Sequence, residues 1–326
     1  MDFRTIIEIP KQNCEITYDS RCIFIGSCFA ENIGIKLRET KICTSVNPTG
    51  ILYNPLSIQK NIHNAIFSKK YNEKDLFFAN GQWNCYDFHS KFSNSDRNIC
   101  LTNLNNASEL LKEKIGNASI IFFTFGTSFV YELRESEEIV CNCHKQPERI
   151  FHRRMLSSSE IVDNWNKCIS EIKSVNPTAK IIFTVSPIRH WRDGAHQNQI
   201  SKANLHIAIN ELNEIIPETN YFPAYEIMMD ELRDYRFYTS DMVHPSEMAI
   251  EYIWERFAET FLSKETKRIA ERISKVVEAS HHRPFNPQSE EYKSFCIKNL
   301  NEISSLKSQY PLLDFDTEEG IFSSAL

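Results

Sequence analysis

Two groups of residues in this chain could carry out chemistry together. A turn of small residues, Gly26-Ser27-Cys28, follows the apolar run at 22–25 and could present a nucleophile at the N-terminus of a helix. Backbone N–H groups and the helix dipole favour negative charge at that point. Asp241 and His244, far along the chain and three residues apart, could supply a base and the group that orients it. These residue types predict an acyl-transfer site.

Glycines mark the ends of the predicted strands. The chain has only eight, so a glycine at a strand end needs a reason such as a positive φ. Gly50 lies in a loop after the second predicted strand, and Gly126 follows the apolar run at 121–125. Backbone N–H groups in such turns can stabilise an oxyanion. We expect the N–H groups of Cys28 and Gly50 to do so, with Thr127 or Ser128 as further donors.

Composition indicates a globular protein and excludes some partners. The 326 residues are 41% hydrophobic and 25% charged, with a net charge of -6. This charge does not provide the basic surface that nucleic-acid binding uses. No apolar stretch reaches the roughly 18 to 20 residues that cross a bilayer, and residues 1–17 lack the apolar segment of a secretory signal. We expect a cytoplasmic protein without a transmembrane segment.

The cysteine pattern predicts neither disulfides nor a metal site. Several of the ten cysteines, such as Cys22 and Cys168, lie in apolar strand or helix patterns, as reduced core thiols do. The cluster Cys141-Asn142-Cys143-His144 matches no common zinc spacing and has no second pair of ligands. The acyl chemistry itself requires no cofactor.

Apolar β-rich runs alternate with helical patterns. Ser157 and Glu160 have the spacing of a capping box, a second helix covers 205–215, and a third begins near Ser246. This alternation predicts a mostly parallel five-stranded sheet covered by helices on both faces, with ligands at the C-terminal ends of the strands. The predicted strands are 22–26, 42–46, 120–125, 181–185 and 221–225.

The sequence predicts an α/β domain, an insertion within it and a helical C-terminal extension. Residues 1–262 are expected to form the α/β domain, with an insertion at about 58–97 that packs over the site because the run 83–90 is both aromatic and polar. Residues 263–326 are charged and helical in pattern, with a last helix from Ser289 to Lys307. We expect them to form a C-terminal extension that caps the domain or makes a homo-oligomer contact.

The substrate pocket is expected beyond the strand at 181–185. Arg189 and His190 follow this strand, at the edge where substrate should lie. Arg189 and Arg192 could bind a carboxylate or phosphate of the substrate, or pair with surface acids. His89 and His144 are further candidates for the pocket.

A family resemblance adds to this interpretation. The segment 24–32 contains the string Gly-Ser-Cys-Phe-Ala after which the GSCFA family is named, and the chain resembles an SGNH (GDSL-like) hydrolase over roughly residues 3–262. The resemblance implies a flavodoxin-like three-layer α/β/α sandwich and ester or acyl chemistry. Further matching motifs are Asn47 to Pro55, Phe125 to Ser128, Ser186 to Gly194 and Asp241 to Pro245.

The resemblance departs from the SGNH pattern at two blocks. The Gly-Asp-Ser block of that superfamily aligns Cys28 with the nucleophile and Ser27 with the aspartate. This implies a thiol nucleophile, with Ser27 as the alternative, and we expect a lowered pKa at Cys28 because it begins a helix beside an imidazole. Where the superfamily has Gly-x-Asn-Asp, this chain has Gly126-Thr127-Ser128-Phe129, without the asparagine donor.

The sequence therefore predicts a hydrolase of an ester or thioester whose substrate is a small-molecule, glycan or lipid ester. Cys28 would attack the acyl carbonyl, His244 would transfer the proton and Asp241 would orient the imidazole. One alternative is an acyltransferase that uses an acyl-coenzyme A or another activated donor. The other is a non-catalytic protein that binds an acylated sugar, lipid or protein.

Overall fold

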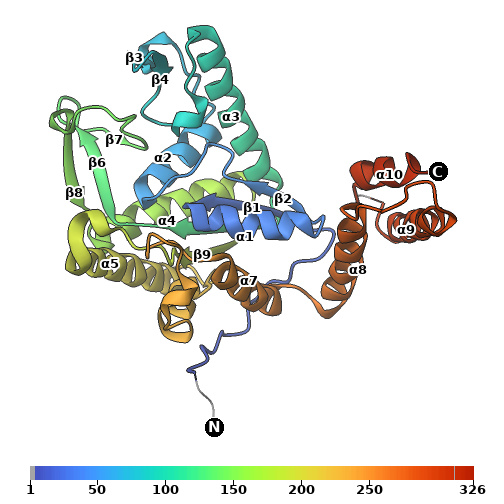
Figure 1. Cartoon of the computed structure of the whole chain (residues 1–326). Coiled ribbons are helices and arrows are strands. Elements are labelled where there is room, and N and C mark those ends of the chain that lie inside the picture. Colours follow the sequence, from blue (N-terminus) through green and yellow to red (C-terminus); the bar gives the residue numbers. More distant parts are fainter. Residues whose placement is uncertain (1–3, 312) are drawn as a thin grey trace.

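A five-stranded parallel sheet forms the centre of the molecule. The computed structural model describes residues 4–311 and 313–326. The strands lie in the order β10-β9-β5-β1-β2, the flavodoxin-like order (Figure 1). The predicted α/β fold class is thereby confirmed. The strands are β1 (Arg21–Gly26), β2 (Cys43–Val46), β5 (Ile120–Phe125), β9 (Lys180–Val185) and β10 (Thr219–Tyr221), and every neighbouring pair is parallel.

The last predicted strand differs from the observed one. It was expected at 221–225, but β10 ends at Tyr221. Pro223 follows at the N-cap of a single helical turn, α6 (Ala224–Glu226). Proline has no N–H to donate and its φ is fixed, so the chain leaves the sheet before it.

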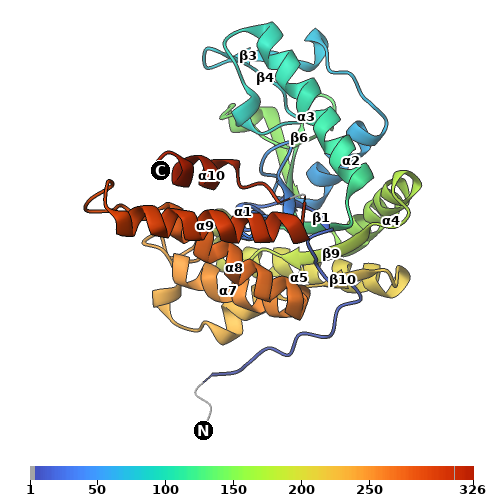
Figure 2. The ribbon, with the colours of Figure 1, turned by 90° about the vertical axis from the view of Figure 1, so that its right-hand side faces the viewer.

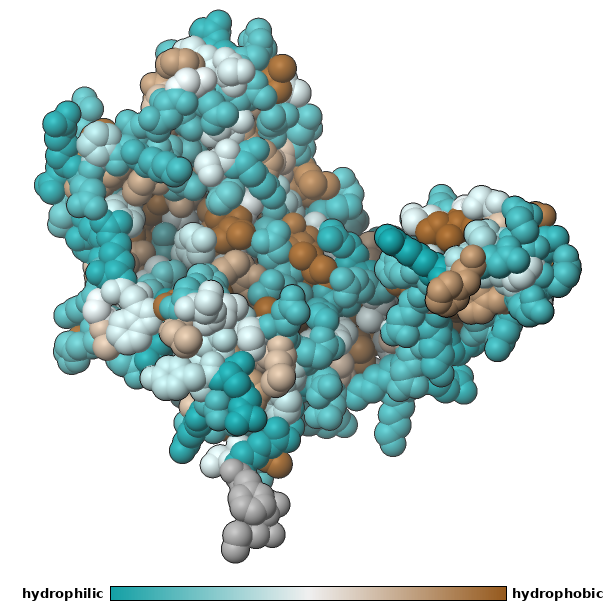
Figure 3. Space-filling model, viewed as in Figure 1, coloured by the Kyte–Doolittle hydropathy of each residue, from teal (hydrophilic) through white to brown (hydrophobic). Residues whose placement is uncertain are grey.

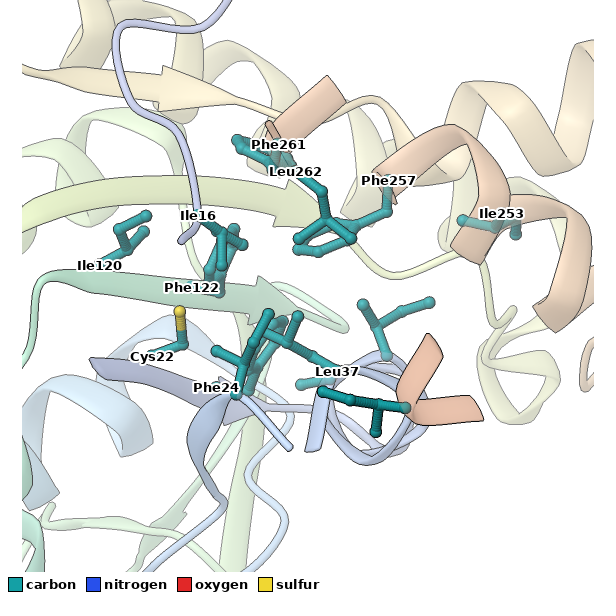
Figure 4. Packing of buried hydrophobic residues seen from close by; sticks show 14 of the residues in the cluster. Ile16, Cys22, Phe24, Leu37, Ile120, Phe122, Ile253, Phe257, Phe261 and Leu262 are labelled. Atoms are coloured by element: carbon teal, nitrogen blue, oxygen red, sulfur yellow. The ribbon is translucent and has the colours of Figure 1, made fainter. Parts of the chain in front are cut away.

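Alternate residues of each central strand face opposite layers of helices. Cys22 and Phe24 of β1 pack with α1 (Cys28–Glu39) and α7 (Glu247–Phe261), whereas Ile23 and Ile25 pack on the other face. Figure 4 shows the first of these two cores, with Phe24, Phe122 and Phe257 in contact. Burial on both faces explains why the strands are nearly continuous apolar runs. The opposite face is covered by α2 (Pro55–Ile66), α3 (Arg97–Asn117), α4 (Ser158–Val175) and α5 (Gly194–Ile215).

The predicted helix starts agree with the observed caps. Ser157 Oγ accepts a hydrogen bond from the N–H of Glu160 at 3.2 Å and begins α4. Ser246 caps α7 and Ser289 caps α9 (Glu290–Gln309) in the same way. A serine that accepts from the third residue of a helix satisfies one of the free N–H groups of its first turn.

A second, antiparallel sheet stands beyond the C-terminal ends of the central strands. It has the order β7-β6-β8 and is formed by β6 (Phe129–Leu133), β7 (Ile139–Val140) and β8 (Phe151–Met155), seen in green in Figure 1. The hairpin β3 (Phe77–Ala79) and β4 (Gln82–Asn84) lies beside α3 in both views. The remaining short helices are η1 (Glu73–Asp75), η2 (Ser90–Phe92), η3 (Glu148–Ile150), η4 (Trp191–Asp193), η5 (Ile227–Glu231) and η6 (Tyr235–Phe237).

The C-terminal segment is helical, as the sequence pattern predicts. It forms α8 (Lys264–Ser280), α9 and α10 (Asp316–Ser323), which lie beside the α1 and α7 layer in Figure 2. Phe315 and Phe322 are fully buried in the same core as α1, and Glu318 pairs with Lys41 at 2.9 Å. Hydrophilic residues predominate on the face drawn in Figure 3. Within the described ranges, no helix is both long and apolar enough to span a bilayer.

Candidate active site

A cavity of about 430 Å³ lies where β1, β5 and β9 end. It is lined by Cys28 from the turn after β1, Thr127 from the turn after β5 and Ser186 from the turn after β9. His244, from the loop before α7, also lines it. The fold therefore brings the first and last segments of the predicted constellation to one cavity, at the edge of the sheet where α/β proteins bind ligands.

Local geometry at the end of β1 requires glycine. Gly26 has a φ of +143°, and a Cβ added there would lie 2.2 Å from the carbonyl oxygen of Thr124. Ser27 then caps α1, since its Oγ accepts a hydrogen bond from the N–H of Phe29 at 3.3 Å, and only 1% of Ser27 is exposed. Cys28 is the first residue of α1 and is half-buried. This turn holds the Cys28 thiol at the wall of the cavity.

The expected lowering of the Cys28 pKa is wrong, because the pKa is raised. Burial raises the pKa of the thiol, and this effect exceeds the lowering by the N–H groups of Cys28 and Phe29. Glu31 raises it further, while Lys202 lowers it. A helix N-terminus thus helps the thiolate, but desolvation disfavours the charged form more strongly. The resting group is a thiol, and a base must remove its proton before it can attack.

His244 and Asp241 form a hydrogen-bonded pair. Asp241 Oδ2 lies 2.6 Å from His244 Nδ1. The other carboxylate oxygen accepts hydrogen bonds from Thr239 Oγ1 at 2.7 Å and from the N–H of Val243 at 2.8 Å. These bonds and the N–H of His244 hold the pKa of Asp241 far below its usual range. An ionised Asp241 accepts the Nδ1 proton, which leaves Nε2 as the basic nitrogen of the ring.

The expected backbone donors are mostly engaged elsewhere. The N–H of Gly50 donates to the carbonyl of Asn47 at 2.9 Å, that of Thr127 donates to the carbonyl of Tyr53 at 3.1 Å, and that of Ser128 donates to Ser201 Oγ at 2.8 Å. Gly50 also packs against His89, because a Cβ added to it would lie 2.3 Å from the His89 Cβ. The structure therefore corrects the oxyanion expectation for these three N–H groups. The N–H of Cys28 has no carbonyl acceptor among the described residues.

Asn54 is a cavity residue that the sequence reasoning did not single out. Its Oδ1 accepts a hydrogen bond from the N–H of Ser57 at 2.8 Å and caps α2, and only 7% of the residue is exposed. Its Nδ2 has no acceptor within the described part of the chain, and Asn54 lines the cavity together with Cys28. The only sequence signal was its place in the motif that ends at Pro55, where an asparagine before proline indicates a helix start.

Three of the five expected substrate residues line the cavity. These are Arg189, His190 and Arg192. Burial, aided by Lys202, lowers the pKa of His190 to about 4, so its imidazole is neutral. His89 and His144 do not line it: His89 Nδ1 accepts from the N–H of Lys91 at 3.2 Å, and His144 is buried with Nε2 2.8 Å from the carbonyl of Cys85. The expectation for these two histidines is corrected, since their rings hold loops together.

The cavity wall that lies opposite the central sheet is formed by other residues than the sequence predicted. Residues 58–97 do not line the cavity, and their first part, 58–66, belongs to α2 on the sheet. Side chains of β6 and β8 form the wall instead, with Phe129, Tyr131 and Arg153 as examples. The predicted insertion has an indirect role, because the carbonyl of Tyr86 accepts the N–H groups of the 141–142 loop that lines the cavity.

A buried lysine lies under the site. Lys202 of α5 is 2% exposed, and its Nζ donates to the carbonyls of Gly126 and Ser186, each at 2.7 Å. It forms no salt bridge with a carboxylate of the described residues. Burial and the nearby charge of Arg189 lower its pKa to about 7. Its place in a helical pattern gave no sequence signal for this role.

No curated protein matches the chain. Among solved structures, an acetyl xylan esterase from the rumen bacterium Butyrivibrio proteoclasticus is similar, with 12% sequence identity and a TM-score of 0.38. The match covers 75% of this chain and 64% of that one, so this chain spans less than two thirds of the esterase. The GSCFA family matches residues 21–257, and the GSCFA domain protein, C-terminal domain, matches residues 273–326. The chain belongs to the GSCFA family.

Proposed function

We propose that this protein is an SGNH-like hydrolase that cleaves an ester or thioester through a covalent acyl-cysteine. The observation that carries the proposal is that Cys28 and His244 line one cavity, with His244 hydrogen-bonded to Asp241, although the two residues lie more than two hundred positions apart in sequence. A thiol, an imidazole and a carboxylate that orients it are the three parts of a nucleophilic triad. Ser27 is the weaker candidate nucleophile because its hydroxyl caps α1.

The reaction proceeds in two halves. His244 Nε2 takes the proton of the Cys28 thiol as Sγ attacks the acyl carbonyl carbon. The tetrahedral intermediate collapses, the bond to the alcohol or thiol breaks, and His244 protonates this leaving group. In the second half His244 takes a proton from water, which attacks the acyl-cysteine. The carboxylic acid leaves and the proton returns to Sγ. Asp241 holds the Nδ1 proton and stabilises the imidazolium throughout.

The oxyanion of both intermediates would receive the N–H of Cys28 and the Nδ2 group of Asn54. Both donors lack acceptors among the described residues, and both belong to residues that line the cavity. Asn54 would thus supply from the start of α2 the amide donor that is missing from the turn after β5. Loss of one such donor commonly costs two to three orders of magnitude in rate.

The test measures whether Cys28, among the ten cysteines of the chain, becomes acylated. The protein is incubated with p-nitrophenyl acetate, and each cysteine-containing peptide is analysed by mass spectrometry. We expect acetylation of Cys28 that is lost in Cys28→Ala and strongly slowed in His244→Ala. Cys143 lines the same cavity, so Cys143→Ala is the matched control and should keep the label. Added alcohols or thiols that accelerate release of the acetyl group would identify a transferase instead of a hydrolase.

A folded protein whose Cys28 takes no label, while release of p-nitrophenol equals the rate in buffer, would refute the proposal. That result would favour a non-catalytic protein that binds an acylated molecule. Labelling of Ser27 in place of Cys28 would transfer the nucleophilic role to the hydroxyl.

A further inference from the structure

Three arginines line the cavity, and two of them are neutralised within the protein. Arg153 makes two hydrogen bonds to the carboxylate of Asp193, one of them at 2.6 Å. Arg192 pairs with Glu148 at the rim. The bidentate pair of Arg153 with Asp193 occupies both oxygens of the Asp193 carboxylate. Asp193 therefore has little capacity left to balance any other positive charge around the cavity.

Arg189 has no such partner. It forms no salt bridge with a carboxylate of the described residues, and its Nε is buried without a hydrogen-bond acceptor. Its neighbours include the phenols of Tyr225 and Tyr238. Burial raises the pKa of both hydroxyls, the Arg189 charge lowers both, and a hydrogen bond from Arg189 lowers that of Tyr225 further. The Nε of Arg153 is buried without an acceptor too, so Arg189 differs from Arg153 in that no carboxylate of the described residues pairs with its guanidinium.

No carboxylate of the described residues forms a salt bridge with Arg189, although Glu226 and Asp230 act on the neighbouring Tyr225. Lys202, beneath the cavity, donates only to carbonyl oxygens. The imidazole of His190 is neutral, and that of His244 is bonded to Asp241. Glu31 acts on the Cys28 thiol from the first turn of α1 but does not line the cavity. A half-buried cavity with an excess of positive charge attracts anions and disfavours neutral ligands of the same shape.

We propose that the cavity selects an acyl donor that carries a carboxylate or phosphate, and that Arg189 binds this group; the inference rests on the acyl chemistry proposed for Cys28. The guanidinium presents a planar set of N–H donors that matches the oxygens of either anion. The anionic group can belong to the acyl half or to the leaving group. In both cases the anion supplies the negative partner that no carboxylate of the described residues provides.

The first test does not depend on ester chemistry. Iodoacetate and iodoacetamide alkylate the Cys28 sulfur with loss of iodide and are similar in size, but only iodoacetate carries a carboxylate. The rate with iodoacetate divided by the rate with iodoacetamide, both measured on the Cys28 peptide, should fall about fivefold to tenfold in Arg189→Gln. Arg189→Lys should keep most of the ratio, because it retains the charge. Arg236 is exposed and pairs with Asp234, so Arg236→Gln is the matched control and should leave the ratio unchanged.

The second test locates the anion on the substrate. We compare p-nitrophenyl acetate with p-nitrophenyl hemisuccinate, whose acyl half carries a carboxylate, and with the acetate ester of 5-hydroxy-2-nitrobenzoate, whose leaving group carries one. At least one anionic ester should be preferred, and Arg189→Gln should lower kcat/KM about tenfold for that ester alone. An unchanged alkylation ratio in a folded Arg189→Gln protein overturns the inference. No ester turnover, with a ratio that still falls, refutes the proposed hydrolase but supports the anion site.

Discussion

Replacing Asn54 with aspartate separates two roles of one side chain. Asn54 Oδ1 accepts the N–H of Ser57 at 2.8 Å, and aspartate retains an oxygen for this bond. Because aspartate caps a helix about as well as asparagine, the free energy of unfolding should change by less than about 1 kcal/mol. The Nδ2 donor is lost and a carboxylate oxygen faces the oxyanion instead. The acylation rate should therefore fall by at least two to three orders of magnitude, or about 2.7 to 4 kcal/mol.

The assay follows the first release of p-nitrophenol from p-nitrophenyl acetate and compares it with alkylation of Cys28 by iodoacetamide. Alkylation forms no oxyanion, so its rate reports only the reactivity of the thiol. Asn54→Ser, which keeps a capping oxygen without adding charge, should lose acylation but keep alkylation within about threefold. Asn72 caps η1 and does not line the cavity, so Asn72→Asp is the matched control. Acylation by Asn54→Ser at the wild-type rate, when Cys28→Ala is inactive, would refute the reasoning.

Three more substitutions test other parts of the structure. Asp241→Asn should slow acylation by two to four orders of magnitude in the p-nitrophenol assay, because an amide no longer selects the tautomer with a basic Nε2; a rate within threefold of wild type would contradict the triad. Lys202 has a folded pKa of about 7, below its unfolded value of 10.5, so the unfolded chain binds more protons between these values and stability rises with pH. In urea, the free energy of unfolding of wild type should rise by up to about 2 kcal/mol relative to that of Lys202→Met between pH 7 and 9. A difference between the two proteins that does not change with pH would contradict this pKa. Gly26→Ala should cost about 3 kcal/mol or more in thermal unfolding, whereas Gly116→Ala, with open space around the added Cβ, should not destabilise; equal melting temperatures would refute the close approach at Thr124.

The sheet and its helices were largely predictable because their signals are local. A strand buried on both faces must be apolar almost throughout, as β5 and β9 are. A helix cap depends on residues within one turn, so Ser157 and Ser246 were recognisable from sequence. The hydrogen bond between Asp241 and His244 follows from a spacing of three residues. The end of β10 departs from the apolar pattern at 221–225 because Pro223 cannot donate a hydrogen bond to the neighbouring strand.

The sequence by itself determined the order of strands and helices, the glycine turn that begins α1 at Cys28, and the pairing of His244 with Asp241, because each depends on neighbours along the chain. Only the tertiary structure decided which N–H groups stay free for a ligand. The carbonyl of Tyr53 and the hydroxyl of Ser201 engage the turn after β5 from distant segments. It also decided the direction of the Cys28 pKa, since desolvation depends on every layer that packs around the thiol rather than on the helix it begins.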